Sequence, residues 1–106
     1  MTKFKQQNIE AIRNSAGKAC ALLKTLANED RLMLLCQLIQ DEKNVGELEQ
    51  ATRIKQPTLS QQLTILRNED IVRTRKDGKF NYYSISSDAV LQLMQTLGHL
   101  YECHDK

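Results

Sequence analysis

The sequence predicts a mainly α-helical domain that carries one small β-hairpin, and three observations support this fold class. Apolar residues recur every three or four positions along most of the chain, which is the period of a helix that buries one face. Between residues 71 and 85 the pattern changes to β-branched and aromatic residues around Asp77-Gly78, which is typical of a hairpin. The 106 residues hold one proline and four glycines and are 41% hydrophobic, as expected of a single folded domain over residues 1–106.

The first two helices are expected at residues 7–26 and 29–39. Asn28 is suited to cap the second helix, and Glu29 and Asp30 are favourable in its first turn. That helix contains LMLLCQLI, which is apolar nearly all round, so we expect it to be the buried central helix, with Cys36 inside it. The apolar stripe of the first helix consists of Ile9, Ile12, Ala16, Ala19, Leu23 and Leu26.

Two further helices are predicted after the polar break DEKN. Asn44 and Glu47 resemble a capping box for a short helix at residues 45–52, with Val45 and Leu48 facing inward. RIKQ is the predicted turn, and Pro57 takes the first position of the next helix, which extends to residue 68. The core-facing residues of that helix are Leu59, Leu63 and Leu66.

A hairpin and a last helix complete the predicted domain. The strands are expected at residues 71–76 and 79–85, joined by Asp77-Gly78 because glycine accepts a positive φ. Ser86 or Ser87 can cap the last helix. The order of four helices, two strands and one helix is that of a winged helix-turn-helix. The apolar stripe of the last helix consists of Val90, Leu93, Met94, Leu97, Leu100 and Tyr101.

The two terminal helices carry apolar stripes that a helix-turn-helix and a hairpin cannot both cover. A twofold homodimer through the first and last helices would bury them, and a domain this small benefits from the extra burial. In the alternative, both stripes close the core of a monomer.

Two segments of the chain are basic, residues 1–27 with five Lys/Arg against one acid and residues 53–79, although the net charge is only +2. Residues 53–79 carry seven Lys/Arg against three acids. Such a localised patch is expected of a protein that binds DNA. Taken alone, however, the charge is equally consistent with an ordinary solvated surface. The patch coincides with a helix whose glutamines and hydroxyls face outward and with the basic hairpin. The expected DNA-binding residues are Gln56, Thr58, Ser60, Gln61, Gln62 and Thr64 on the helix, and Arg73, Arg75, Lys76 and Lys79 on the hairpin.

These side chains suit the grooves of double-stranded DNA. Gln61 can form paired hydrogen bonds to an adenine edge in the major groove. The hairpin cations can contact the phosphate backbone or enter the minor groove. In a dimer, the two helices would meet half-sites roughly 34 Å apart. Ile65 also falls on the outward face, where it contacts a thymine methyl or packs on another element.

Other classes of protein are less consistent with the sequence. No segment approaches the roughly 20 apolar residues of a membrane span, and the N-terminus lacks the apolar core of a signal peptide, so a cytoplasmic protein is expected. Cys20, Cys36 and Cys103 are an odd number, which fits free thiols better than a disulfide framework. There is no glycine-rich phosphate loop and no nucleophile–base set, so neither an enzyme nor a cofactor is predicted.

Four segments occur in order along the chain: LANEDRLxxL, VGEL, LSQxLxxLR and RxDGxxxxY. In these segments, and over almost its whole length, the chain resembles the ArsR/SmtB family of bacterial repressors. The resemblance implies a homodimeric winged helix that binds a palindromic operator and releases it on sensing an inducer. The recognition helix of the family usually has Ser-Gln-His where this chain has Ser60-Gln61-Gln62, so the roles of Ser60 and Gln61 carry over.

Cys36 in LLCQL and Cys103 in LYEC match the thiol pair of the thiol-based, BigR/SqrR-like branch of persulfide-sensing repressors. This resemblance implies that reactive sulfur or an oxidant is the inducer and joins the two thiols within one protomer. Cys20 has no counterpart and is interpreted as packing. Without the resemblance, Cys36 would be read as a small buried hydrophobe.

Two alternatives remain open. A metal-responsive repressor of the same family would have to use His99, Cys103 and His104, which are too few for a convincing zinc site, so no metal is predicted. A winged helix that binds another protein and not DNA is the second alternative.

Overall fold

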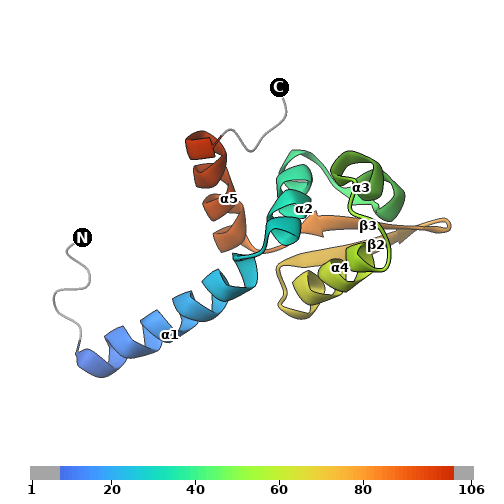
Figure 1. Cartoon of the computed structure of the whole chain (residues 1–106). Helices are drawn as coiled ribbons and strands as arrows, with labels where there is room; N and C mark the ends of the chain where they lie inside the picture. Colours follow the sequence, from blue (N-terminus) through green and yellow to red (C-terminus); the bar gives the residue numbers. More distant parts are fainter. Residues whose placement is uncertain (1–7, 102–106) are drawn as a thin grey trace.

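The computed structural model describes residues 8–101, in which four helices pack against a small antiparallel sheet and the first helix projects away from it (Figure 1). The prediction of a mainly helical fold with a hairpin is confirmed. The elements are α1 (Ile9–Leu26), α2 (Glu29–Gln40), β1 (Lys43–Asn44), α3 (Val45–Thr52), α4 (Thr58–Asn68), β2 (Val72–Asp77), β3 (Phe80–Ile85) and α5 (Asp88–Tyr101).

Side-chain caps start four of the helices. The Oδ1 atoms of Asn8 and Asn28 each accept a hydrogen bond from the backbone N–H three residues on, at 2.7 and 3.0 Å. At α3 the capping box is complete, because Asn44 and Glu47 each accept from the other's backbone N–H at 2.9 Å. Ser87 caps α5 in the same way at 3.2 Å. These caps satisfy donors that a helix leaves unpaired in its first turn, so the sequence sets where the helices begin.

The sheet has three strands in the order β1-β3-β2, one more than predicted. The extra strand is β1, which pairs Lys43 with Tyr83 and Asn44 with Tyr82. The sequence predicts a polar break, DEKN, at these two residues. A two-residue strand has no alternation to detect, and it exists only because β3 lies beside it.

The turn of the hairpin is shifted by one residue from the prediction. Asp77 pairs with Phe80 across the ladder, so Gly78 and Lys79 form the two-residue loop. Gly78 has φ 63°, and a residue without Cβ adopts this conformation at no steric cost. Pro57, likewise, precedes α4 by one residue and is not its first helical residue.

The hydrophobic core lies around α2, which packs against α3, α4, α5 and β3. The predicted central place of α2 is confirmed, but the helix is not buried on every side, because Met33 is exposed while Cys36 and Ile39 are half-buried. The largest fully buried side chains of this core are Leu34, Leu35, Leu48, Leu59, Leu63, Leu66, Ile71, Val90 and Met94.

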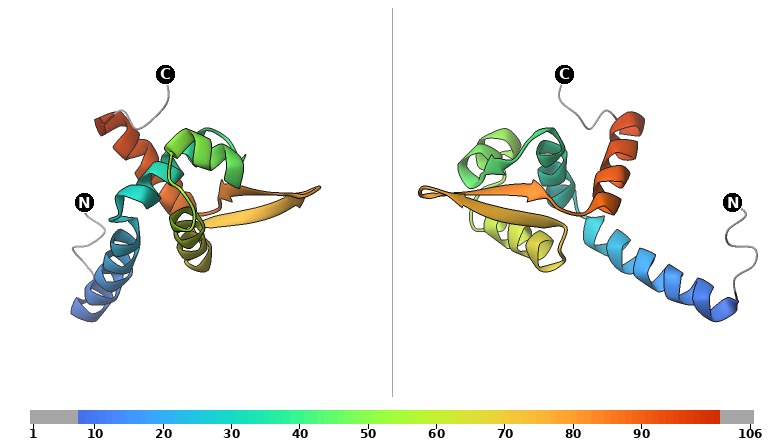
Figure 2. Two further views of the ribbon diagram at one scale, coloured as in Figure 1. Left: turned by 45° about the vertical axis from the view of Figure 1, so that its right-hand side comes forward. Right: turned by 180° about the vertical axis from the view of Figure 1, so that it is seen from behind.

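Helix α1 projects from this body (Figure 2). Most of its apolar stripe is exposed. Leu26 is buried and Leu22 packs against the core, but Ile9 and Leu23 are 69% and 57% exposed. The end of α5 is similar, with Leu100 65% exposed. Neither α1 nor any other helix in residues 8–101 combines the length and apolarity needed to cross a membrane.

Candidate nucleic-acid interface

The turn between α3 and α4 is anchored from inside the domain. The hydroxyl of buried Thr52 donates to the Leu48 carbonyl at 2.7 Å and accepts from the Ile54 N–H at 3.2 Å. Arg53 adopts a left-handed conformation with φ 64°, which ends α3 and reverses the chain. Ile54 is buried beyond it. These contacts fix the start of α4 relative to α3, as a helix-turn-helix requires.

The outer face of α4 presents short polar side chains to solvent. Ser60, Gln61 and Thr64 are exposed, and together with Ile65 they line a shallow hollow along the helix. Ile65 is 37% exposed, so it belongs to this surface and not to the core. The structure therefore brings the predicted major-groove residues together on one accessible face.

Gln56 and Thr58 are less available to DNA than the other residues predicted on this helix. Gln56 is exposed, but its Oε1 accepts a hydrogen bond from the backbone N–H of Ser60 at 3.1 Å. It therefore satisfies a backbone donor in the first turn of α4, a helix that has no side-chain cap at its N-cap residue, Pro57. Thr58 is half-buried at the start of the helix.

Gln62 makes a contact within the protein that the sequence analysis missed. Its Oε1 accepts a hydrogen bond from Nη1 of Arg31 at 2.7 Å, and both residues are half-buried. Arg31 lies 31 positions earlier in the chain, so no local pattern could reveal the pairing. The amide oxygen of Gln62 is thus bonded to α2, although the residue also borders the hollow on the outer face of α4, whereas Gln61 is exposed there.

The wing, β2 and β3 with their loop, extends beyond the helices at the side of the molecule opposite α1 (Figure 1). Arg73, Lys76 and Lys79 are all exposed on it, as predicted for side chains that contact DNA. Nζ of Lys79 lies 5.7 Å from the ring centre of exposed Phe80, close to the tip. The wing therefore presents positive charge next to the exposed face of α4.

Arg75 is exposed but already has a partner. Its Nε and Nη2 donate to the two carboxylate oxygens of Glu42 at 2.9 and 2.6 Å, and the guanidinium carbon lies 5.0 Å from the ring centre of Tyr82. Because Tyr82 is on β3 and Glu42 immediately precedes β1, Arg75 spans the middle strand of the sheet. Arg75, which was predicted to contact DNA, therefore also holds the wing against the segment that precedes β1.

The contact sets the ionisation of both partners. The hydrogen bonds from Arg75, and then its charge, lower the pKa of Glu42 below that of an ordinary glutamate, although partial desolvation opposes them. The same pair raises the pKa of Arg75. Because the pKa of Glu42 is lowered in the folded state, the stabilisation is present above the pKa of an unfolded glutamate. It is lost as the pH falls through the lowered value.

Replacing Arg75 by glutamine should return the pKa of Glu42 towards that of an ordinary glutamate. The carboxyl carbon of Glu42, followed by NMR during an acid titration, gives the pKa directly. Arg67→Gln, which removes an exposed arginine at the end of α4, is the matched control and should leave the titration of Glu42 unchanged. Identical titrations of Glu42 in the wild type and Arg75→Gln would show that the pair does not form in solution.

Of the predicted thiol pair, only Cys36 lies within the described residues. It is half-buried on α2 and packs against the core, one helical turn before Ile39. Ile39 and residues of α5, among them Met94 and His99, line a hollow between the two helices. Cys103 and His104 lie outside the described residues. Cys20 is exposed on α1 and has a free thiol, so its interpretation as a packing residue is wrong for this chain taken alone.

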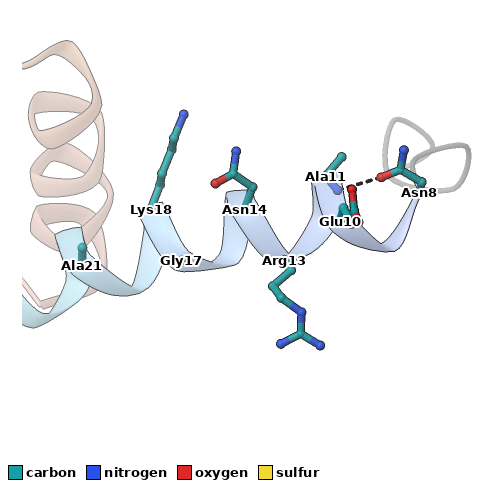
Figure 3. A pocket seen from close by; sticks show the side chains of 8 residues that line it. All are labelled: Asn8, Glu10, Ala11, Arg13, Asn14, Gly17, Lys18 and Ala21. Atoms are coloured by element: carbon teal, nitrogen blue, oxygen red, sulfur yellow. Dashed lines mark hydrogen bonds between the residues drawn. The ribbon is translucent and has the colours of Figure 1, made fainter.

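Neither a metal site nor a ligand pocket is formed by two further features of the described residues. No group of three or more His, Cys, Asp or Glu side chains within residues 8–101 is arranged to hold a metal ion. A hollow along α1 is lined by Asn8, Glu10, Ala11, Arg13, Asn14, Gly17, Lys18 and Ala21 (Figure 3). It lies on the polar side of one projecting helix, away from its apolar stripe, so it is an open surface and not a ligand site.

Comparison with known proteins supports a regulatory function. The sequence pattern described as "Bacterial regulatory protein, arsR family" matches residues 28–74. The chain is 46% identical to a biofilm growth-associated repressor of Agrobacterium fabrum, over 84% of this chain and 76% of the relative. It is 39% identical to the transcriptional activator HlyU of Vibrio cholerae, over 89% of this chain and 87% of that protein.

Solved structures agree with the sequence comparison. The transcriptional repressor BigR from Xylella fastidiosa is similar with a TM-score of 0.85 and 41% identity, over 93% of this chain and 98% of that one. A homodimeric winged helix-turn-helix DNA-binding domain from Mycobacterium bovis, Mb0332, is similar with a TM-score of 0.72 and 27% identity, over 97% of this chain and 99% of that one. The helix-turn-helix and wing described above are thus those of DNA-binding regulators.

Proposed function

Because this chain belongs to the arsR family of bacterial regulatory proteins, we propose that it is a dimeric repressor that releases a palindromic operator when reactive sulfur bridges Cys36 and Cys103. The observation that carries the DNA-binding part is the exposed face of Ser60, Gln61 and Thr64 beside a basic wing. Backbone contacts by the wing supply affinity and register, and contacts by α4 to base edges supply specificity.

Dimerisation is supported by the uncovered stripes of α1 and α5. In a single chain the apolar stripes of both helices are exposed to water, at Ile9 and Leu23 on α1 and at Leu100 and Tyr101 on α5. A second copy would cover these residues around a twofold axis. Two α4 helices would then face half-sites about one helical turn of DNA apart.

The proposed sensing of reactive sulfur is supported by the position of Cys36 in the fold. It lies on α2, which packs against both α4 and α5, and Cys103 follows the last residue of α5 by two positions. A bond between the two thiols would therefore tie the end of the α5 segment to the helix that supports α4. If α5 contributes to the dimer, this tie changes the relative placement of the two α4 helices.

The chemistry needs a persulfide, which supplies both sulfur and oxidising equivalents. One cysteine thiolate takes the terminal sulfur of a persulfide RSSH and releases the thiol RSH. The second thiolate then displaces hydrogen sulfide and forms a disulfide. When both cysteines first take a sulfur atom, loss of hydrogen sulfide leaves a bridge with one extra sulfur. Such a bridge spans a larger gap than a disulfide, which needs Cα atoms within about 7 Å.

Persulfide treatment of the purified dimer should lower operator affinity about 5- to 150-fold, the usual range for coupling between two sites. Intact-mass measurement should show the bridge, with or without an extra sulfur atom. Cys36→Ser should lose both the bridge and the response. Cys20→Ser, which removes the exposed thiol on α1, is the matched control and should respond normally. If Cys36→Ser still responds, or zinc and not persulfide lowers the affinity, the sensing proposal is wrong.

A further inference from the structure

The guanidinium of Arg31 joins α1 to α4. Its Nε donates to the backbone carbonyl of Thr25 at 2.6 Å, and its Nη1 donates to Oε1 of Gln62 at 2.7 Å. Thr25 is in the last turn of α1, Arg31 is in the first turn of α2, and Gln62 is in the middle of α4. One planar group on α2 is therefore hydrogen-bonded to both α1 and α4.

The contact with α1 is favourable for two reasons. The Thr25 carbonyl is among the last four of α1, which lack intrahelical partners. The partial negative charge at that end of the helix also attracts a cation. Arg31 forms no ion pair with another described residue, so these dipoles and the Gln62 amide are what its charge contacts. All three residues are half-buried, which limits competition from water.

The contact with α4 fixes the direction in which the recognition face points. Gln62 and Gln61 are adjacent on α4, so holding Gln62 against α2 also fixes the rotation at which Gln61 faces outward. Within residues 8–101, the two hydrogen bonds of Arg31 connect α1 with α4. Arginine suits this position because its donors are held in one rigid fork, which lysine lacks.

We propose that Arg31, acting through Gln62, is a positioning residue that makes the DNA-reading rotation of α4 depend on the placement of α1. The proposal deepens the proposed function and rests on it, because it assigns the route between the dimer helix and the DNA-reading helix. It also gives Gln62 a role within the protein and not as a direct base contact.

Operator affinity in a double-mutant cycle tests the proposal. A duplex selected by the wild-type protein from a random-sequence pool serves as the operator. Arg31→Lys and Gln62→Met should each weaken binding about 2- to 30-fold, and the double variant should bind no more weakly than the weaker single variant. Arg13→Lys, on the polar side of α1 (Figure 3), is the matched control and should bind normally. Gln62→Glu, which keeps an acceptor for Arg31, should retain tighter binding than Gln62→Met.

Two outcomes of the cycle would overturn the proposal. Additive losses would mean that Gln62 contacts DNA independently of Arg31. Unchanged affinity in both single variants would mean that the link only supports the fold. All affinities are measured at a temperature where circular dichroism shows every variant folded, so that unfolding does not contribute.

An NMR comparison separates failure of this proposal from failure of the proposed function. Backbone amides of α4 and the side-chain amide of Gln62 should shift in Arg31→Lys and stay in place in Arg13→Lys. If no duplex is selected by the wild-type protein, the DNA-binding function fails, and the shifts still decide whether Arg31 positions α4. Unshifted α4 amides in Arg31→Lys would overturn the positioning role.

Discussion

Gln61→Ala is expected to weaken operator binding by about 1–3 kcal/mol in each half-site, because paired hydrogen bonds from a glutamine to an adenine edge contribute about that much discrimination. Gln61 is exposed on the outer face of α4, and no hydrogen bond within the described residues engages its side chain. Its loss should therefore leave the fold intact. In a dimer the loss of binding free energy occurs in both half-sites, so the total loss is among the largest expected of a single surface substitution.

The change should appear as loss of specificity more than loss of electrostatic attraction. Affinity is measured for the selected operator and for unrelated DNA over a range of salt concentrations. The salt dependence should be unchanged in Gln61→Ala, since the wing cations that contact phosphates remain. Gln40→Ala, at the exposed end of α2, is the control and should bind like the wild type. Equal weakening on operator and unrelated DNA would exclude a base contact by Gln61.

Leu63→Ala, two residues further along the same helix, should instead destabilise the whole domain by about 2–5 kcal/mol. Its side chain is 1% exposed in the core, so truncation leaves a cavity as well as removing apolar contact. The total free energy of unfolding of such a domain is only about 5–15 kcal/mol. The substitution therefore removes a large share of the free energy of unfolding and disrupts the packing of α4 against α2.

Urea unfolding at one fixed protein concentration measures this effect, because in the proposed dimer the apparent stability would depend on concentration. Leu63→Met is the matched control and should cost less than about 1.5 kcal/mol, since it conserves volume. A Leu63→Ala protein as stable as Leu63→Met would contradict the packing of α4 described here.

Local physical chemistry explains why most elements could be predicted. Asn28, Asn44 and Ser87 cap helices through bonds to residues only three positions away, and the apolar period of each helix is also local. The glycine at the wing turn is required by its own φ. The exposed polar face of α4 follows from the same periodicity, since Leu59, Leu63 and Leu66 occupy the opposite side.

The candidate site was less predictable where it depends on partners far away in the chain. Gln56, Gln62 and Arg75 were all predicted to contact DNA from their residue types and positions. The structure gives them partners within the protein: the first turn of α4 for Gln56, Arg31 for Gln62, and Glu42 for Arg75. Neither Arg31 nor Glu42 carries a local signal, because the pairings span 31 and 33 positions.

By itself, the sequence determined the order of the helices and wing, the caps at Asn28, Asn44 and Ser87, and the outward position of Gln61 and Thr64 on α4. These features depend on residues within one or two turns of each other. Only the tertiary structure decided that Lys43–Asn44 forms a strand, that Arg75 braces the wing, and that Arg31 links α1 to Gln62. Each of these contacts forms between segments that only the packing of the whole domain brings together.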